Sequence, residues 1–197
     1  LEYASIIGLT FSVYELRNLT QSAENELRSI ISKTSKLAII EETDNIDYIK
    51  FAHDIIREIF KNKVDEQHIE YYNSLAMCIK EIKPDQYLRR ARYFMKCQLT
   101  EDAITLYILE IIKQIRLYGK VLPTVYDEIN PLFNPLQREY INLMQESYSL
   151  YSQKKYKDAS SKLDLILDVY PIELLAERDI LRIRCYSKTM ASTEIQK

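Results

Sequence analysis

Residues 37–51 read Leu-Ala-Ile-Ile-Glu-Glu-Thr-Asp-Asn-Ile-Asp-Tyr-Ile-Lys-Phe, and in this stretch helical spacing of apolar residues gives way to a strand pattern. The run Leu37–Ile40 is short, apolar and partly β-branched, whereas Glu41–Asp47 is polar and typical of a turn. In Tyr48–Phe51 the side chains alternate in character, which gives a strand one apolar face. The two runs therefore predict one β-hairpin.

Helical patterns flank this hairpin on both sides. The helices expected before it are Leu1–Ile7, a segment capped by Thr10 or Ser12 that runs to about Leu19, and a segment that starts at Ser22 and carries Leu27, Ile30 and Ile31. After the hairpin, Asp54 is expected to cap a helix whose inward residues are Ile55, Ile56, Ile59 and Phe60. This order of elements is the plan of a winged-helix domain, which we expect over residues 1–64.

From about Asp65 onward, helical stripes follow one another without a further strand pattern. The expected helices are His68–Ile82, Pro84–Cys97, Thr100–Tyr118, Leu136–Gln153, Lys157–Val169 and Pro171–Met190. Between the third and fourth, the segment Pro123–Pro135 holds three prolines and is expected to be a loop around a short helix, Val125–Asn130.

An internal repeat supports a helical solenoid. Residues 140–173 resemble one tetratricopeptide unit, in which small residues let two helices approach closely. Ser147 takes the place of the small residue, Tyr156 that of the aromatic at the turn, and Ala159 that of the alanine in the second helix. Pro171 follows Ala159 at the spacing of the closing proline.

A weaker copy over residues 84–117 keeps Ala91 and Ala103 at the spacing of Ser147 and Ala159. The expected fold class is therefore mainly α. A small winged-helix domain with one β-hairpin is followed, over residues 65–197, by tetratricopeptide-like helical hairpins forming a right-handed α-solenoid. A generic α-helical bundle is the alternative.

Composition excludes several classes of function. The only two glycines, Gly8 and Gly119, lie far apart, so the chain has neither a Walker A loop nor a dinucleotide fingerprint. A net charge of −2 gives no global attraction to nucleic acid or to an anionic membrane. Three scattered cysteines favour free thiols and a cytoplasmic location. No cysteine lies at metal-ligand spacing from His53 or His68, so no metal site is expected.

The block of residues 48–60, Tyr-Ile-Lys-Phe-Ala-His-Asp-Ile-Ile-Arg-Glu-Ile-Phe, resembles the end of the winged-helix domain in STAND-class signalling NTPases. In that family a strand ends in an aromatic residue and a His-Asp pair, and a helix follows at once. Leu1–Ser12 is similar to the opening of the same domain, and His68–Met77 to the helix that joins it to the repeats. By order of elements, the resemblance covers about residues 1–110.

The resemblance implies a non-catalytic regulatory or sensor fragment rather than an enzyme. Its winged-helix switch would use His53 to sense the phosphates of ADP, while Asp54 caps the next helix and Arg57 and Glu58 lie at the surface or between domains. The nucleotide-binding core is absent from these residues and is expected ahead of Leu1, because the chain also lacks a start methionine. ATP or ADP would bind the parent protein, and this fragment holds no cofactor.

In such a protein, a protein or peptide ligand on the repeats shifts the winged helix off the ADP-bound core. ATP exchange and homo-oligomerisation follow, with transcription regulation or antiviral defence as the output. Two alternatives stay open: a free-standing helical-repeat scaffold, and a winged-helix DNA-binding regulator. The second would use Arg28, Lys33 and Lys36 of the third helix, where Glu24 and Glu26 weaken attraction to phosphate. Nucleic acid is therefore not the expected partner.

One stretch is both basic and aromatic. Its candidate partner-binding residues are Arg89, Arg90, Arg92, Tyr93 and Lys96. Guanidinium, ammonium and phenol groups together suit contact with phosphate or with an acidic protein. Ordinary helix-surface charge is the alternative explanation.

Overall fold

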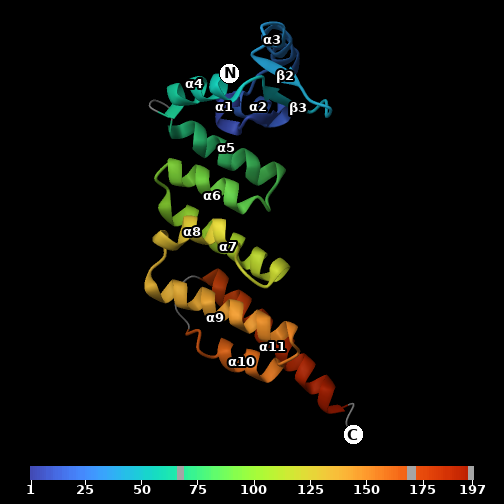
Figure 1. The fold of residues 1–197 in the computed structure, drawn as a ribbon, viewed down its shortest axis with the longest axis vertical. Helices are drawn as coiled ribbons and strands as arrows, with labels where there is room; N and C mark the ends of the chain where they lie inside the picture. Colours follow the sequence, from blue (N-terminus) through green and yellow to red (C-terminus); the bar gives the residue numbers. More distant parts are fainter. Residues whose placement is uncertain (66–68, 168–171, 195–197) are drawn as a thin grey trace. The chain divides into compact units, whose positions relative to one another are not determined.

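The computed structural model describes residues 1–65, 69–167 and 172–194 of the 197-residue chain. The fold is mainly α, with a small three-stranded antiparallel sheet near the N-terminus (Figure 1). The chain forms two compact units, Leu1–Ala103 and Ile104–Lys197. The first unit extends beyond residue 64, and the domain boundary expected there stays a prediction.

The first unit contains the sheet. Its elements are α1 (Glu2–Ile7), β1 (Thr10–Ser12), α2 (Val13–Thr20), α3 (Glu24–Lys36), β2 (Ile40–Glu42), β3 (Tyr48–Phe51), α4 (Asp54–Asp65), α5 (Ile69–Ile82) and α6 (Tyr87–Lys96). The elements of the second unit are α7 (Thr100–Tyr118), whose first turn belongs to the first unit, α8 (Pro123–Ile129), a 3-10 turn (Asn130–Leu132), α9 (Pro135–Ser152), α10 (Tyr156–Leu163) and α11 (Ile172–Glu194).

The sheet has the strand order β1-β3-β2, and both pairs are antiparallel. The hairpin is confirmed, but its first strand begins three residues later than Leu37. Leu37 is the C-cap of α3 and Ala38 has a φ of 53°, so pairing starts only at Ile40. The predicted polar turn was wrong at Glu41 and Glu42, which belong to β2 and pair with Lys50 and Ile49 of β3. The Glu41 carboxylate lies 3.0 Å from the ammonium nitrogen of Lys50.

Strand β1 was not predicted. It is only three residues long, too short for a strand period to appear in the sequence. Its last residue, Ser12, also caps α2, because the Ser12 hydroxyl accepts a hydrogen bond from the Tyr14 amide at 3.2 Å. The expected cap at Ser12 is therefore confirmed, and the same residue ends the strand.

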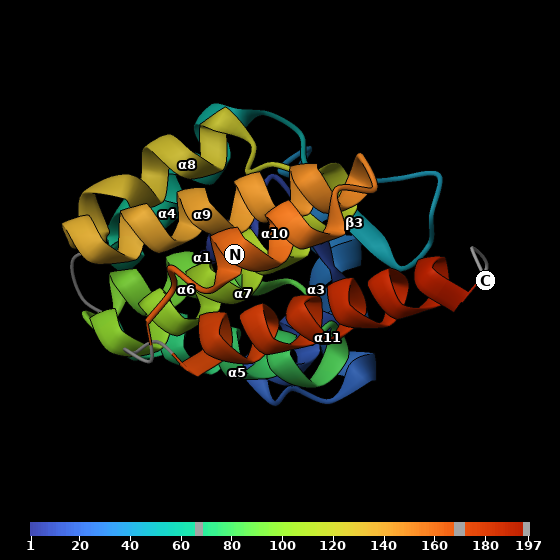
Figure 2. The ribbon, with the colours of Figure 1, turned by 90° about the horizontal axis from the view of Figure 1, so that it is seen from below.

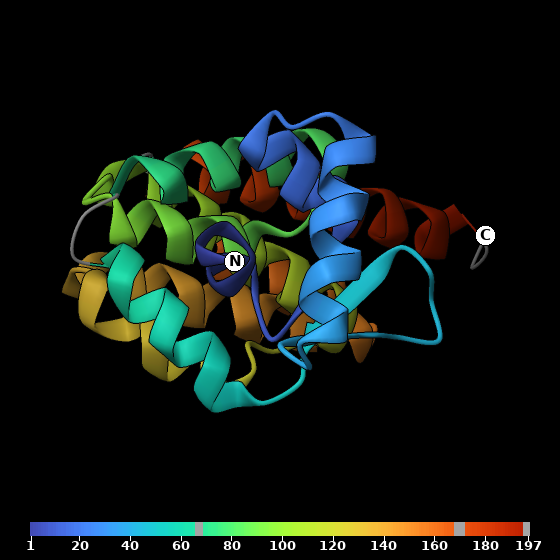
Figure 3. The ribbon, with the colours of Figure 1, turned by 90° about the horizontal axis from the view of Figure 1, so that it is seen from above.

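The core of the first unit lies under one face of the sheet. Phe11 of β1 and Phe51 of β3 are buried, and their ring centroids lie 5.6 Å apart. Leu75 and Ile79 of α5 are fully buried in the same cluster. Helix α1 packs against α2 and α4, and α5 packs against α2 and α6. Figure 3 shows α1 nearly end-on, with α4 beside it.

The expectation for α4 was wrong at two positions. Ile56 and Phe60 are half-buried as predicted, but Ile55 and Ile59 are 68% and 54% exposed. The neighbours of α4, which are α1 and β3, cover only one stripe of the helix. The predicted cap at Asp54 was also wrong by one residue, because Asp54 is already the first residue of the helix. The carbonyl oxygen of His53 accepts hydrogen bonds from the helical amides of Ile56 and Arg57 at 3.1 and 3.4 Å.

In the second unit, α9 packs against α10, and α10 packs against α11 (Figure 2). Ser147 and Ala159, the small residues of the predicted repeat, are both fully buried. The rings of Tyr151 and Tyr156 lie 5.3 Å apart across the turn. Helix α7 has the predicted bounds, whereas α10 ends at Leu163, short of Val169. The closing Pro171 and the helix start at His68 lie outside the described residues, as does Val169.

A buried carboxylate joins three helices of the second unit. Glu177 on α11 is 2% exposed and accepts hydrogen bonds from Arg116 on α7 and from the Tyr148 hydroxyl on α9. Burial by itself would raise the pKa of Glu177, but the bonds to Arg116 and Tyr148 outweigh it and lower the pKa. The ionised carboxylate is therefore the stabilising form.

Substitution of Phe51 by alanine should lower the free energy of unfolding by about 3–5 kcal/mol, because it leaves a cavity in a packed core. Ile55→Ala, four residues along the chain, should change it by only about 0.5 kcal/mol, because that side chain is exposed. Urea unfolding followed by circular dichroism measures both. Equal losses would contradict the placement of Ile55 on the open side of α4.

Glu177→Gln should lower the stability at pH 7 by about 1–3 kcal/mol. The wild-type advantage should be full above pH 4.5, the ordinary pKa of the glutamate, and should shrink as the pH falls through the lowered folded-state pKa. Urea unfolding at several pH values between 3 and 7 tests this.

The control is Glu146→Gln, because Glu146 is half exposed and pairs with the exposed Lys162 at 2.7 Å. That variant should lose less than about 1 kcal/mol at pH 7. A Glu177→Gln deficit that stays constant down to pH 3 would show that the lowered pKa of Glu177 does not contribute to stability.

Candidate functional site

His53 lies in the short link between β3 and α4, and its side chain is exposed. The first turn of α4 next to it is held by charged groups. Arg57 Nη1 lies 3.5 Å from the Asp54 carboxylate and 2.7 Å from that of Glu58. Arg57 Nε donates to the carbonyl oxygen of Ser5 at 3.1 Å, which fastens α4 to α1. The imidazole is thus presented on a helix end that is fixed to the rest of the unit.

A second candidate site, here called the basic pocket, is a cavity of about 380 Å³ in the first unit. Its walls come from α1, α4, α5 and α6. The lining residues are Ile6, Ile7, Arg57, Lys61, Tyr72, Arg89, Arg92, Tyr93 and Lys96. Five of these are cations, and none of the lining residues that the structure describes is acidic. The basic pocket therefore concentrates positive charge in a chain whose net charge is −2.

Arg89 forms the most ordered part of the basic pocket. Its guanidinium donates to both oxygens of Glu15, each at 3.1 Å, and to the Ile7 carbonyl oxygen at 3.2 Å. The Glu15 side chain is only 4% exposed, and a buried carboxylate is costly without a paired cation. Burial by itself would lower the pKa of Arg89, but interactions with Tyr93 and Glu15 raise it. Arg89 thus serves first as the counter-ion that attaches α6 to α2.

Tyr93 completes this wall. Its hydroxyl lies 3.2 Å from the Ile6 carbonyl oxygen and 3.3 Å from that of Ile7, and it accepts from Arg89 Nε at 3.3 Å. Burial raises the pKa of Tyr93, so the hydroxyl keeps the proton that it donates. The last carbonyls of a helix have no partner within the helix. Arg89 and Tyr93 satisfy the carbonyl oxygens of Ile6 and Ile7, and Arg57 satisfies that of Ser5.

The other four cations of the basic pocket come from α4 and α6. Lys61 and Arg57 share the carboxylate of Glu58, at 3.4 and 2.7 Å. Arg92 and Lys96 are exposed on α6, and Lys96 forms no ion pair with any residue that the structure describes. The spacings Arg57–Lys61 and Arg92–Lys96 each correspond to about one helical turn. Each helix thus directs a pair of cations at the same cavity.

The structure brings together four of the five residues selected from the sequence. Arg89, Arg92, Tyr93 and Lys96 line the basic pocket, but Arg90 does not. Arg90 is buried on another side of α6, and its Nη1 donates to the Pro84 carbonyl oxygen at 3.2 Å. Burial lowers the pKa of Arg90.

Arg57 and Lys61 were missed as members of this cluster. Their spacing of four residues along one helix was visible in the sequence. The sequence did not show that α1 packs against both α2 and α4. Residues of α4 and α6, about thirty positions apart, line one cavity as a result.

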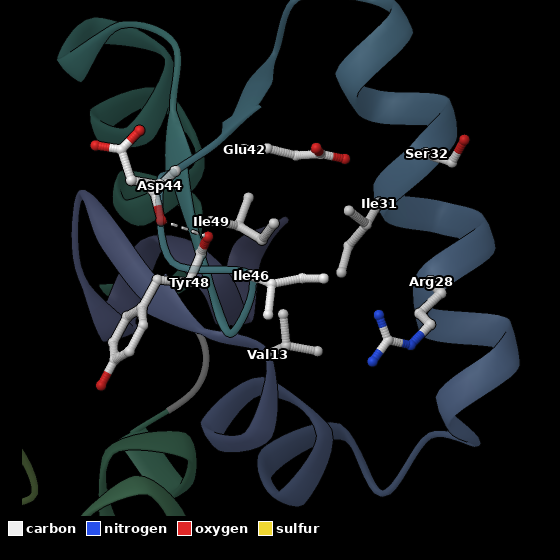
Figure 4. A pocket seen from close by; sticks show the side chains of 10 residues that line it. Val13, Arg28, Ile31, Ser32, Glu42, Asp44, Ile46, Tyr48 and Ile49 are labelled. Carbon is white, nitrogen blue, oxygen red and sulfur yellow. Dashed lines mark hydrogen bonds between the residues drawn. The ribbon is translucent and has the colours of Figure 1, made fainter.

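A larger cavity of about 450 Å³ lies between α3 and the β2–β3 loop (Figure 4). Val13, Ile31 and Ile46 point toward one another across it, while Glu42 and Asp44 lie on the hairpin side. Arg28, which the DNA-binding alternative would use, also lines it. Its guanidinium lies 2.8 Å from the Glu24 carboxylate, so part of the positive charge of α3 is already neutralised.

Arg89→Ala should lower the free energy of unfolding by about 3–5 kcal/mol, because it leaves the buried Glu15 carboxylate without its cation. Glu15→Ala should cost less, because Arg89 is more exposed and keeps its bonds to the Ile7 carbonyl and Tyr93. The double variant should lose less than the sum of the two. Lys96→Ala, at the exposed rim, is the control and should change stability by about 0.5 kcal/mol. Urea unfolding measures all four, and the reverse order of the single variants would contradict the role given to Arg89.

Comparisons of the chain with protein-family models, with curated proteins and with solved structures found no match. Among the described residues, no helix is both long and apolar enough to cross a membrane. Over the same part of the chain, no three His, Cys, Asp or Glu side chains are grouped so as to hold a metal ion.

Proposed function

We propose that the chain is a non-catalytic regulatory segment of a STAND-type NTPase. The first unit is then its winged-helix switch, and the helix pairs that follow begin a tetratricopeptide-like sensor. Support comes from the order α1-β1-α2-α3-β2-β3 and from the central place of β3 in the sheet, which is the order expected of a winged helix. Helix α4 follows β3 after only two residues, Ala52 and His53, as the resemblance requires.

The observation that carries the proposal is the exposed surface of α4. His53 is exposed at the start of the helix, and Ile55 and Ile59 are exposed one turn apart along it. Two large apolar side chains at this spacing form a stripe that favours burial against a partner. A nucleotide-binding core that carries ADP would supply an apolar cover for the stripe and a phosphate for the imidazole.

The switch then works through differential binding. A neutral or protonated imidazole donates a hydrogen bond to a phosphate oxygen, so His53 stabilises the state in which the first unit lies against ADP. A protein or peptide that binds the repeats stabilises the separated state, and ATP replaces ADP in the parent protein. Homo-oligomerisation follows, and the output is transcription regulation or antiviral defence. The close pairing of α9, α10 and α11 supports the repeats as the binding surface.

His53→Ala in the full product of the gene should speed ADP release by about 10- to 100-fold, because a hydrogen bond to a charged group contributes about 1.5–3 kcal/mol. Basal activity should rise. Release of a fluorescent ADP analogue from the purified protein measures the rate. The matched control is Asn62→Ala, an exposed residue near the other end of α4, which should leave the rate unchanged.

A second variant tests the apolar stripe. Ile55→Asp should also loosen ADP, because it introduces a charge at the contact with the core while leaving the fold of the first unit intact. Unchanged ADP release in both variants would reject the switch. A native product of about 23 kDa, with no Walker A loop, would reject it as well. In that case, the free-standing helical-repeat scaffold becomes the better description.

A further inference from the structure

We propose that the basic pocket binds the phosphate group of a small phosphorylated molecule. This inference is independent of the switch described above, because it uses neither His53 nor a nucleotide-binding core. The described lining residues of the basic pocket all belong to the first unit.

The described lining of the basic pocket is strongly positive. Five cationic side chains line a cavity of about 380 Å³, and none of its described lining residues is acidic. Asp54 and Glu58 pair with Arg57 and Lys61, and Glu15 pairs with Arg89, but none of these three carboxylates is among the described lining residues, so the described lining carries an excess of positive charge. A phosphate monoester carries close to two negative charges at neutral pH. Its entry would neutralise the excess and strengthen every charge-assisted hydrogen bond around it.

The side chains that line the basic pocket differ in how firmly other residues hold them. Arg89 and Tyr93 are held by Glu15 and by the carbonyls of α1, so they form a rigid wall. Lys61 on α4 and Lys96 on α6 line the same cavity, and each ammonium group has three donors, of which Lys61 uses one for Glu58. Lys96 makes no ion pair with a described residue, so the structure leaves its donors to solvent or to a ligand.

Part of the lining of the basic pocket is apolar. Ile6, Ile7 and the buried ring of Tyr72 line the same cavity, and the rings of Tyr72 and Tyr93 lie 5.9 Å apart. A bare inorganic ion would leave this surface unused, whereas an organic phosphate would cover it. The cavity volume lies within the range of small-molecule sites, about 300–1,000 Å³.

The same features disfavour a nucleic acid. Its backbone needs cations spread along a path, so that successive phosphates are neutralised together. Here the cations converge on one cavity, and the chain as a whole is slightly acidic. One phosphate of a long polyanion would be attracted to the basic pocket, whereas the other phosphates would be repelled by the acidic groups of the chain.

Isothermal titration of the 197-residue chain with phenyl phosphate tests the inference. Binding is expected at low salt and should weaken as the salt concentration rises. Lys61→Met and Lys96→Met should each raise the Kd by about tenfold, because each removes one charge-assisted contact. Lys80→Met, at an exposed site on α5 outside the basic pocket, should leave the Kd unchanged. Unchanged melting temperatures of the three variants confirm that they are folded.

Two further titrations identify the source of the phosphate. Inorganic phosphate should bind more weakly than phenyl phosphate, because it does not contact the apolar wall. A twenty-nucleotide single strand should compete poorly at equal phosphate concentration. Absence of phenyl phosphate binding at millimolar concentration, or binding that neither lysine variant weakens, would overturn the inference. Preferred binding of the single strand would overturn it in favour of a nucleic-acid surface.

Discussion

The pairing of Arg89 with the Glu15 carboxylate determines how the first unit is assembled. Glu15 is buried on α2, and a buried carboxylate without a cation is costly. Its cation comes from α6, 74 residues along the chain. The same guanidinium satisfies a terminal carbonyl of α1, so one side chain connects three helices. This constraint explains why the unit extends through α5 and α6, and it places Arg92 and Lys96 of α6 opposite Arg57 and Lys61 of α4.

Local patterns in the sequence predicted much of the fold. The alternation in Tyr48–Phe51 indicated a strand, and Ile49 and Phe51 are indeed buried. The Ser12 cap and the bounds of α7 were also correct. The predictions that were wrong concern features that depend on contacts between residues distant in sequence. Strand β1 is defined by its pairing with β3, and the exposure of Ile55 follows from how little of α4 its neighbours cover.

The candidate site was predicted in part for the same reason. Arg92 and Tyr93 follow Arg89 by three and four residues, and Lys96 follows them by four and three, so all four share one broad face of α6. Arg90 follows Arg89 directly and is turned by about 100° around the helix axis, which takes it to another side. The contributions of α1 and α4 come from distant parts of the sequence. No local pattern linked them to α6, because the connection depends on the buried ion pair between Arg89 and Glu15. Glu15 is a single acidic residue in α2, and its sequence context does not indicate that it is buried.

The order of strands in the sheet has a consequence for solubility. The longest strand, β3, lies in the centre, and both edges are formed by strands of only three residues. An exposed strand edge can recruit a strand from another molecule, and very short edges with charged side chains discourage this. The outer strand β2 carries Glu41 and Glu42, and β1 continues directly into α2. The hairpin therefore keeps its apolar face in the core without offering a template for aggregation.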